Sequence, residues 1–144
     1  YQGQSYELTV PIEPAQSFDE VRAFARMVAE VLASRHPEAL TTRLRKEERQ
    51  GRVFLDYLRN SYAQTSVAPY SLRAKQGAPV AMPLTWEELA SPPINARSYG
   101  LHNIWSLLSQ RPDPLLSIRL QPLSAALERL SALARGLRRE GSAQ

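Results

Sequence analysis

The chain has 144 residues, of which 43% are hydrophobic and 22% charged, and its formal net charge is +4. This length suits one domain with a single core of two packed layers, and the composition is that of an ordinary globular protein. No apolar run approaches the roughly 18 residues that span a bilayer. The absence of cysteine excludes disulfides, thiolate nucleophiles and Cys-based metal sites. A chain without disulfides fits a reducing compartment, so the cytoplasm is the expected location.

The first expected elements are a strand and a helix. Residues 6–12 alternate, with Tyr6 and Leu8 on one face and Glu7 on the other, which predicts a half-buried strand. A Ser-Phe-Asp-Glu capping box at residues 17–20 then begins a helix, whose apolar residues recur at helical spacing until His36-Pro37 ends it.

The connector that follows, residues 42–51, is rich in basic residues. Between residues 41 and 60 six basic side chains face three acidic ones, and sixteen of the eighteen basic residues of the chain are arginine. Arginine pairs bidentately with phosphate, so this clustering indicates a polyanion site. A GC-rich genome would give the same overall preference for arginine, so only the clustering carries this interpretation.

The segment from Arg52 to Arg73 sets one carboxylate, Asp56, inside an apolar run. Strand alternation would place Val53, Leu55 and Tyr57 on one face and would present Asp56 on the other. Such a carboxylate needs a metal, water or a basic partner such as Arg59 or Arg73. The alternative is an edge-strand aspartate that faces solvent.

The rest of the chain predicts sheet margins and then helices. Residues 65–71 and 79–83 are short, proline-bounded extended segments. A second capping box, Thr85 to Glu88, begins a short helix, and a proline-rich loop follows at residues 91–95. Leucine spacing predicts further helices over residues 101–108 and 123–137, with Trp86 and Trp105 packed in the core. The arginines of the last helix, at 129, 135, 138 and 139, are typical of a solvated helix end.

Four blocks of sequence carry a family resemblance. They are GRVFLDYLRN, VAPYSLRA and GAPVAMPLTWEEL, preceded by FDEVRAFARMVAEVLASRHPE. In this order they closely resemble the C-terminal half of the primase-polymerase domain of bacterial ATP-dependent ligase D, a branch of the archaeo-eukaryotic primase superfamily. The resemblance covers roughly Val10 to Leu108.

The resemblance implies an α+β fold: a partial primase-type core with an RNA-recognition-like antiparallel sheet packed by helices, followed by a helical C-terminal tail. It divides the chain into residues 1–110, the polymerase half, and 111–144, a helical extension. It also implies nucleotide addition at DNA ends during non-homologous end joining, by two-metal phosphoryl transfer.

The resemblance further implies the roles of four residues. Asp56 falls on the third of three metal-binding aspartates, where it would be a catalytic ligand of Mg²⁺ or Mn²⁺. Arg73 falls on the arginine that contacts the incoming triphosphate, and Arg49 and Arg59 fall on other basic positions of the site. The implied partners are DNA ends and nucleoside triphosphates, together with an upstream polymerase half, a ligase domain or an end-binding protein, and no membrane.

Departures from the family pattern limit this reading. The family's Asp-x-Asp pair has no counterpart, and the phosphate loop expected over residues 1–7 keeps only Gly3, with Gln4 for lysine and Glu7 for histidine. The chain is therefore a fragment of such a polymerase, weak or inactive alone, or a non-catalytic nucleic-acid-binding relative, or a small interaction domain. We expect Asp56 and Arg73 to converge on the open face of the sheet, near Glu7.

Overall fold

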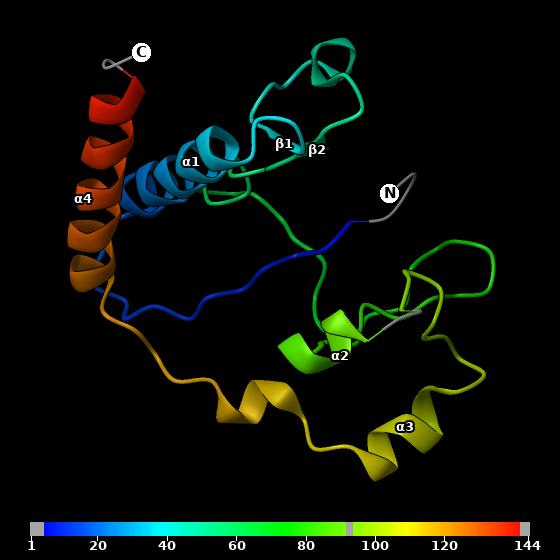
Figure 1. Cartoon of the computed structure of the whole chain (residues 1–144). Helices are drawn as coiled ribbons and strands as arrows, with labels where there is room; N and C mark the ends of the chain where they lie inside the picture. The colour runs from blue at the N-terminus through cyan, green and yellow to red at the C-terminus, as the bar shows by residue number, and fades with distance from the viewer. Residues whose placement is uncertain (1–4, 92–93, 142–144) are drawn as a thin grey trace. The chain divides into compact units, whose positions relative to one another are not determined.

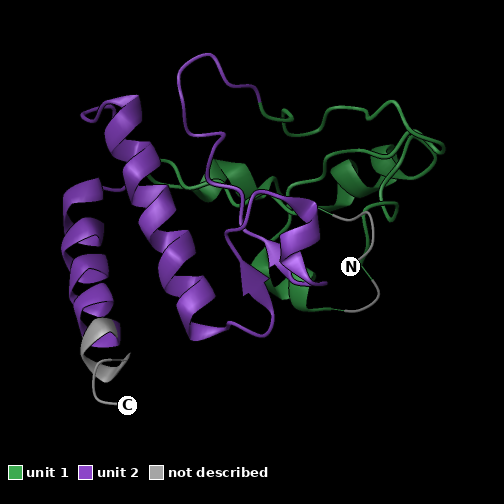
Figure 2. Cartoon of the chain, turned by 90° about the horizontal axis from the view of Figure 1, so that it is seen from above, with its two compact units in different colours: residues 1–11, 66–119 green, residues 12–65, 120–144 purple. Residues whose placement is uncertain are grey.

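The computed structural model describes residues 5–91 and 94–141, and it divides the chain into two compact units that interleave along the sequence. Unit 1 comprises Tyr1–Pro11 and Ser66–Arg119, and unit 2 comprises Ile12–Thr65 and Leu120–Gln144 (Figure 2). Helices and a small sheet make the fold α+β, as expected. The expected division at residues 110 and 111 stays a prediction. No helix among the described residues is long and apolar enough to cross a membrane.

Unit 2 is organised by α1, Phe18–Arg35 (Figure 1). The predicted capping box is confirmed: the Ser17 hydroxyl accepts the Glu20 amide N–H at 3.3 Å, and a Glu20 carboxylate oxygen accepts the Ser17 N–H at 2.8 Å. Both contacts satisfy amide groups that have no partner within the helix. The helix ends where the His36 N–H donates to the Leu32 carbonyl, directly before Pro37.

The last helix, α4, spans Leu123–Gly141 and packs against α1. Ala29 and Val31 of α1 and Leu123 and Leu130 of α4 are buried. Burying a side chain of leucine size stabilises a fold by about 1.5–3 kcal/mol, so this helix pair supplies the main apolar core of unit 2. The side chains of the predicted arginines 138 and 139 lie outside the described residues.

The expected antiparallel sheet is not found in the described part of the chain. The sheet there has two parallel strands, β1 (Leu40–Thr41) and β2 (Val53–Phe54), with Leu40 opposite Val53 and Thr41 opposite Phe54. Parallel pairing requires a crossover rather than a tight hairpin turn. Residues 42–52 form that crossover. Local sequence periodicity predicts a strand but not the direction in which it pairs with its neighbour.

Of two further predicted strands, the one over residues 6–12 is not formed, and the one around Asp56 is shorter than expected. Residues 5–11 are extended but belong to no strand, and Ile12 forms an isolated parallel bridge with Gln121. The strand predicted around Asp56 ends at Phe54, so the alternation of faces does not reach the aspartate.

Unit 1 contains α2 (Trp86–Ala90) and α3 (Ile104–Gln110). Isolated antiparallel bridges join Leu72 to Val80 and Pro79 to Gly100. The segment predicted at residues 79–83 therefore forms single bridges, and residues 65–71 belong to no strand or bridge, so neither is the margin of a described sheet. A Cβ on Gly100 would lie 3.0 Å from the Gly77 carbonyl oxygen, so any other residue there would need the neighbouring backbone to move by a few tenths of an ångström. The buried apolar side chains of unit 1 include Val80 and Ile104.

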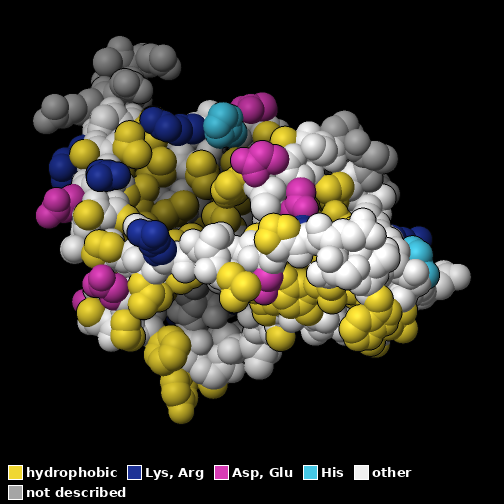
Figure 3. Space-filling view, turned by 90° about the horizontal axis from the view of Figure 1, so that it is seen from below, with side chains coloured by type: hydrophobic (Ala, Val, Ile, Leu, Met, Phe, Trp, Pro, Cys, Tyr) yellow, Lys and Arg dark blue, Asp and Glu magenta, His cyan; other side chains and the backbone are white. Residues whose placement is uncertain are grey.

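The predicted burial of the two tryptophans is wrong. Trp86 is 68% exposed and Trp105 is 75% exposed, although the helices that carry them form where they were expected. Hydrophobic side chains are widely visible on the face drawn in Figure 3. Of the proline-rich loop predicted at residues 91–95, residues 92 and 93 lie outside the described residues.

Candidate functional site

The basic connector is held in shape by Arg49. Residues 46–49 form a 3₁₀ turn, and the Arg49 guanidinium donates from Nε to the Arg43 carbonyl at 3.2 Å and from Nη2 to the Leu44 carbonyl at 2.8 Å. Its guanidinium carbon lies 4.1 Å from the centre of the Phe54 ring, within the range of a cation–π contact. Arg49 thus ties the connector to β2. These two bonds use two of the five N–H donors of the Arg49 guanidinium, which leaves three for a phosphate. The phosphate-binding role of Arg49 stays a prediction.

Arg52 fixes the other end of the connector and was missed by sequence reasoning. Its guanidinium donates to the carbonyls of Arg49, Glu48 and Pro37 at 3.0, 3.1 and 3.4 Å. Gln50 and Gly51 between them adopt positive φ angles of 50° and 79°, a conformation that glycine takes without steric cost. The Arg-Gln-Gly-Arg order was the available signal for such a turn.

Asp56 lies in a turn directly after β2. One carboxylate oxygen accepts the Leu58 N–H at 2.9 Å, and the other lies 3.9 Å from Arg59 Nε. The aspartate side chain is 41% exposed and the arginine side chain 60%. This aspartate turn is a local arrangement typical of the residue. It leaves both the carboxylate and the guanidinium accessible to a ligand, and it brings these two predicted site residues together.

Arg73 belongs to unit 1, where a tight turn carries it. The Arg73 N–H donates to the Pro79 carbonyl, and the Tyr70 N–H donates to the Ala81 carbonyl, both at 2.8 Å. Gly77 and Ala78 close the turn with φ angles of 86° and 42°. The half-buried Arg73 side chain forms no ion pair with a carboxylate in the described part of the chain, so its guanidinium is available for an anion.

Tyr70, next to this turn, is anchored by a contact that sequence reasoning missed. Its hydroxyl donates to Asp113 Oδ1 at 2.6 Å, across 43 positions of sequence, and the same oxygen accepts the Leu115 N–H. Burial and the bond to Asp113 raise the pKa of Tyr70 to about 12. The hydrogen bond from Tyr70 in turn lowers the pKa of Asp113. This bond therefore holds a neutral phenol against a charged carboxylate.

A second polar contact joins α2 to the segment after α3. Arg111 Nη2 donates to the Glu88 carboxylate and to the Pro83 carbonyl, the latter at 2.7 Å. Glu88 also caps its own helix by accepting the Thr85 N–H. The Thr85 capping box was predictable, but its use as an anchor for Arg111 was not, because the partner lies 23 positions away.

The predicted metal site is incomplete in the described residues. They contain no group of three or more His, Cys, Asp or Glu side chains that could hold a metal ion. Asp56 belongs to unit 2, whereas Glu7 and Arg73 belong to unit 1, so their convergence stays a prediction. A single carboxylate does not provide the oxygen ligands that Mg²⁺ or Mn²⁺ requires, and these residues alone do not fit the metal that the resemblance implies.

The fold has a clear counterpart among solved structures. The polymerase domain from Mycobacterium tuberculosis ligase D, solved in complex with DNA, superposes with a TM-score of 0.67 at 31% sequence identity. The match covers 73% of this chain and 36% of that chain. The α+β arrangement is thus that of part of a polymerase domain.

Sequence relatives agree with this fold. The multifunctional non-homologous end joining protein LigD of Pseudomonas aeruginosa is 42% identical over 89 residues, which is 62% of this chain and 11% of that protein. The bifunctional LigD of Bacillus subtilis is 29% identical over 129 residues, or 86% of this chain and 21% of that protein. The matched parts of the chain therefore span 11% and 21% of the length of these two relatives.

The family model of the LigD primase-polymerase domain matches residues 3–115. The chain belongs to the LigD primase-polymerase domain family. The matched range contains Arg49, Asp56, Arg59 and Arg73.

Proposed function

We propose that this chain is the phosphate-binding part of an end-joining DNA polymerase, which adds nucleotides to DNA ends by metal-dependent phosphoryl transfer in the cytoplasm. The observation that carries the proposal is the family match over residues 3–115, which includes all four predicted site residues. The DNA-bound state of the solved relative supports DNA as a partner.

Arg59 and Arg73 are the proposed phosphate-binding residues. Both guanidiniums lie outside the internal bonds that hold Arg49 and Arg52. A free guanidinium offers a phosphate two parallel N–H donors. In this proposal Arg73 binds the triphosphate of an incoming nucleotide, and Arg59 binds phosphates beside Asp56.

Asp56 is proposed as the contribution of this chain to the metal site. Because the described residues supply no complete ligand group, the other ligands must come from elsewhere, for example from an upstream polymerase half. A ligase domain or an end-binding protein is a further proposed partner.

Because the metal-ligand group is incomplete in the described residues, we predict that the 144-residue chain alone has no measurable polymerase activity. Primer extension with Mn²⁺ and ribonucleoside triphosphates tests this, with Asp56→Ala as the control for contamination. Template-dependent extension that disappears in the Asp56→Ala variant would show that the chain holds its metal without further ligands, contrary to the proposal.

Asp56 is a single carboxylate, and this favours a second candidate function: the chain is a non-catalytic relative that binds nucleic acid. The two functions differ in nucleotide binding. The polymerase proposal predicts that the chain binds a ribonucleoside triphosphate and that Arg73→Ala weakens this binding by about tenfold or more, the loss of one charge-assisted contact. DNA binding without triphosphate binding would favour the non-catalytic relative. Arg97→Ala, an exposed arginine of the same unit, is the matched control.

A further inference from the structure

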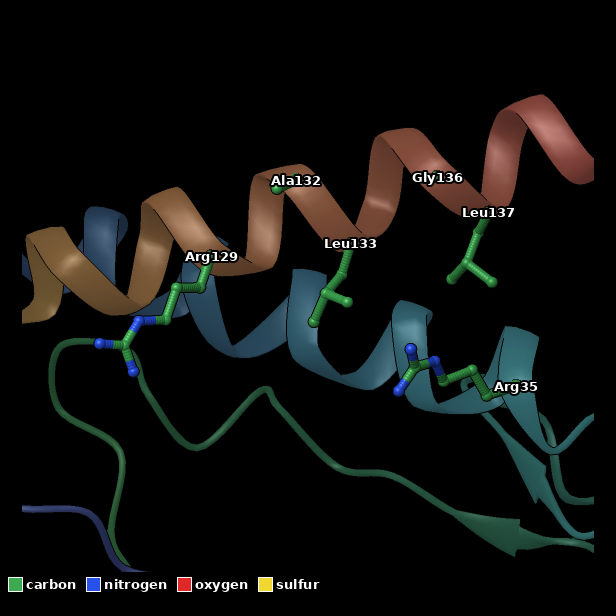
Figure 4. A pocket seen from close by; sticks show the side chains of 6 residues that line it. All are labelled: Arg35, Arg129, Ala132, Leu133, Gly136 and Leu137. Atoms are coloured by element: carbon green, nitrogen blue, oxygen red, sulfur yellow. The ribbon is translucent and has the colours of Figure 1, made fainter.

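Unit 2 has a groove that the proposed function does not use. It runs along the α1–α4 pair, has a volume of about 520 Å³, and is lined by Arg35, Arg129, Ala132, Leu133, Gly136 and Leu137. Leu133 and Leu137 project from α4 toward α1, and Arg35 extends from α1 beside them (Figure 4). Leu133 is 43% exposed. The groove is thus an apolar strip between two helices.

Two arginines border this strip. Within the described ranges, neither Arg35 nor Arg129 forms a hydrogen bond or ion pair with a carboxylate, whereas Arg26, on the same helix as Arg35, is paired with Glu30 at 2.7 Å. Both groove arginines are exposed. Guanidiniums beside apolar surface are well placed to bind carboxylates that a ligand brings with its own apolar side chains.

Gly136 lines the groove. A Cβ built at this position meets no atom within 4 Å, so no close packing of the chain requires glycine there. Glycine inside a helix is about 1 kcal/mol less favourable than alanine. Glycine at position 136 therefore lowers the stability of α4 and leaves this part of the groove wall without a side chain.

We propose that this groove binds an acidic amphipathic helix of a partner protein. A helix laid along two packed helices buries its apolar face against Leu133 and Leu137 and pairs its carboxylates with Arg35 and Arg129. Residues seven positions apart in a helix lie about two turns apart on one face. The matching partner can therefore present two acidic residues at this spacing, beside a row of leucines.

Charge and composition favour this occupant over two others. A second copy would bring a like-charged α4, which has four arginines and two glutamates in its sequence, so self-association opposes positive to positive. A nucleic acid would need a row of phosphate contacts, whereas the wall between the two arginines is apolar.

The test uses the full chain and a designed probe. The probe is a fluorescein-labelled 18-residue helical peptide with leucines at helical spacing and two glutamates seven positions apart; its control replaces both glutamates with lysine. Fluorescence anisotropy is expected to show binding of the acidic probe that weakens as salt increases, and at least about tenfold weaker binding of the lysine control.

Variants of the chain locate the probe. Arg35→Glu with Arg129→Glu is expected to weaken binding by at least about tenfold, and Gly136→Trp, which fills the groove, should abolish it. Gly136→Ala leaves the groove open and should bind the probe as the parent does. Arg97→Glu, an exposed charge in unit 1, is the matched charge control. Circular dichroism confirms that each variant keeps its helices.

Three outcomes would overturn the proposal. The first is probe binding that is unchanged by both Gly136→Trp and the double charge reversal. The second is a dimer in light scattering that Gly136→Trp dissociates, because the occupant is then a second copy. The third is binding of a single-stranded oligonucleotide, but not of the probe, that the double charge reversal removes.

Discussion

Unit 2 is held together by apolar packing of two long helices, whereas the long-range links of unit 1 are mainly polar. In unit 2, Ala29 and Val31 of α1 and Leu123 and Leu130 of α4 are all buried. In unit 1, Tyr70 bonds to Asp113 and Arg111 bonds to Glu88, while Trp86 and Trp105 are exposed. Apolar packing is roughly proportional to area and tolerates small shifts, but a polar contact is lost when one partner is removed. The two units should therefore respond to different substitutions.

The largest effect is expected from Leu130→Ala in unit 2. Leu130 is buried on α4, and truncating a buried leucine costs about 2–5 kcal/mol through lost burial and the cavity that remains. Urea unfolding followed by circular dichroism measures this change. Leu127→Ala, an exposed leucine on the same helix, should cost much less. Equal costs for the two variants would show that α4 does not derive its stability from the α1 contact.

The next effect is expected from Arg111→Met in unit 1. The substitution keeps a similar apolar length but leaves the Glu88 carboxylate and the Pro83 carbonyl without their guanidinium partner. Because Arg111 is largely buried, we expect a loss of about 1–3 kcal/mol. Hydrogen exchange should increase at α2 and around residues 111–118, with Arg97→Met as the exposed control. Unchanged exchange at α2 would contradict the anchoring role of Arg111.

A smaller effect is expected from Tyr70→Phe, which removes the hydroxyl that donates to Asp113. One such hydrogen bond contributes about 1 kcal/mol. The loss should be seen as a slightly lower midpoint of thermal unfolding, with faster exchange at the Leu115 amide, whose acceptor is the same Asp113 oxygen. Tyr62→Phe, at an exposed tyrosine, should leave both measurements unchanged.

The Tyr70–Asp113 hydrogen bond predicts that the stability of the fold depends on pH in both the alkaline and the acid range. The folded chain raises the pKa of Tyr70 from about 10 to about 12, so the contribution of Tyr70 to stability is complete below pH 10 and lost as the pH rises toward 12. The pKa of Asp113 is lowered, so its contribution is present above the ordinary carboxyl pKa and lost in acid. Ultraviolet titration of the phenols should show a late transition that Tyr70→Phe removes.

Features set by neighbouring residues could be predicted from the sequence. The capping boxes at Ser17 and Thr85 and the helices that follow them depend on contacts three positions apart, and both are confirmed. The turn at Asp56 also depends on a local bond, to the Leu58 N–H, but the apolar run around it favoured a strand. Short-range sequence patterns therefore identified the right residues, but at Asp56 they predicted a strand where the backbone forms a turn.

Features set by distant partners could not be predicted. The parallel direction of β1 and β2 depends on the path of the connector, and helical spacing at Trp86 and Trp105 does not reveal whether a surface covers them. The bonds of Arg49 to the carbonyls of Arg43 and Leu44 likewise depend on the folded shape of the connector. An arginine count alone cannot separate arginines that brace the backbone from those that are available for phosphates.

The central proposal is that Arg59, beside Asp56, binds nucleic-acid phosphate, whereas the exposed Arg22 of α1 does not. The most direct test is the salt dependence of DNA-end affinity, measured by fluorescence anisotropy for the parent chain, Arg59→Ala and Arg22→Ala, an exposed α1 arginine. Each lost phosphate contact reduces the slope of log affinity against log salt by about one. We predict this reduction for Arg59→Ala and an unchanged slope for Arg22→Ala. Equal slopes in all three proteins, or no DNA binding at low salt, would contradict the account.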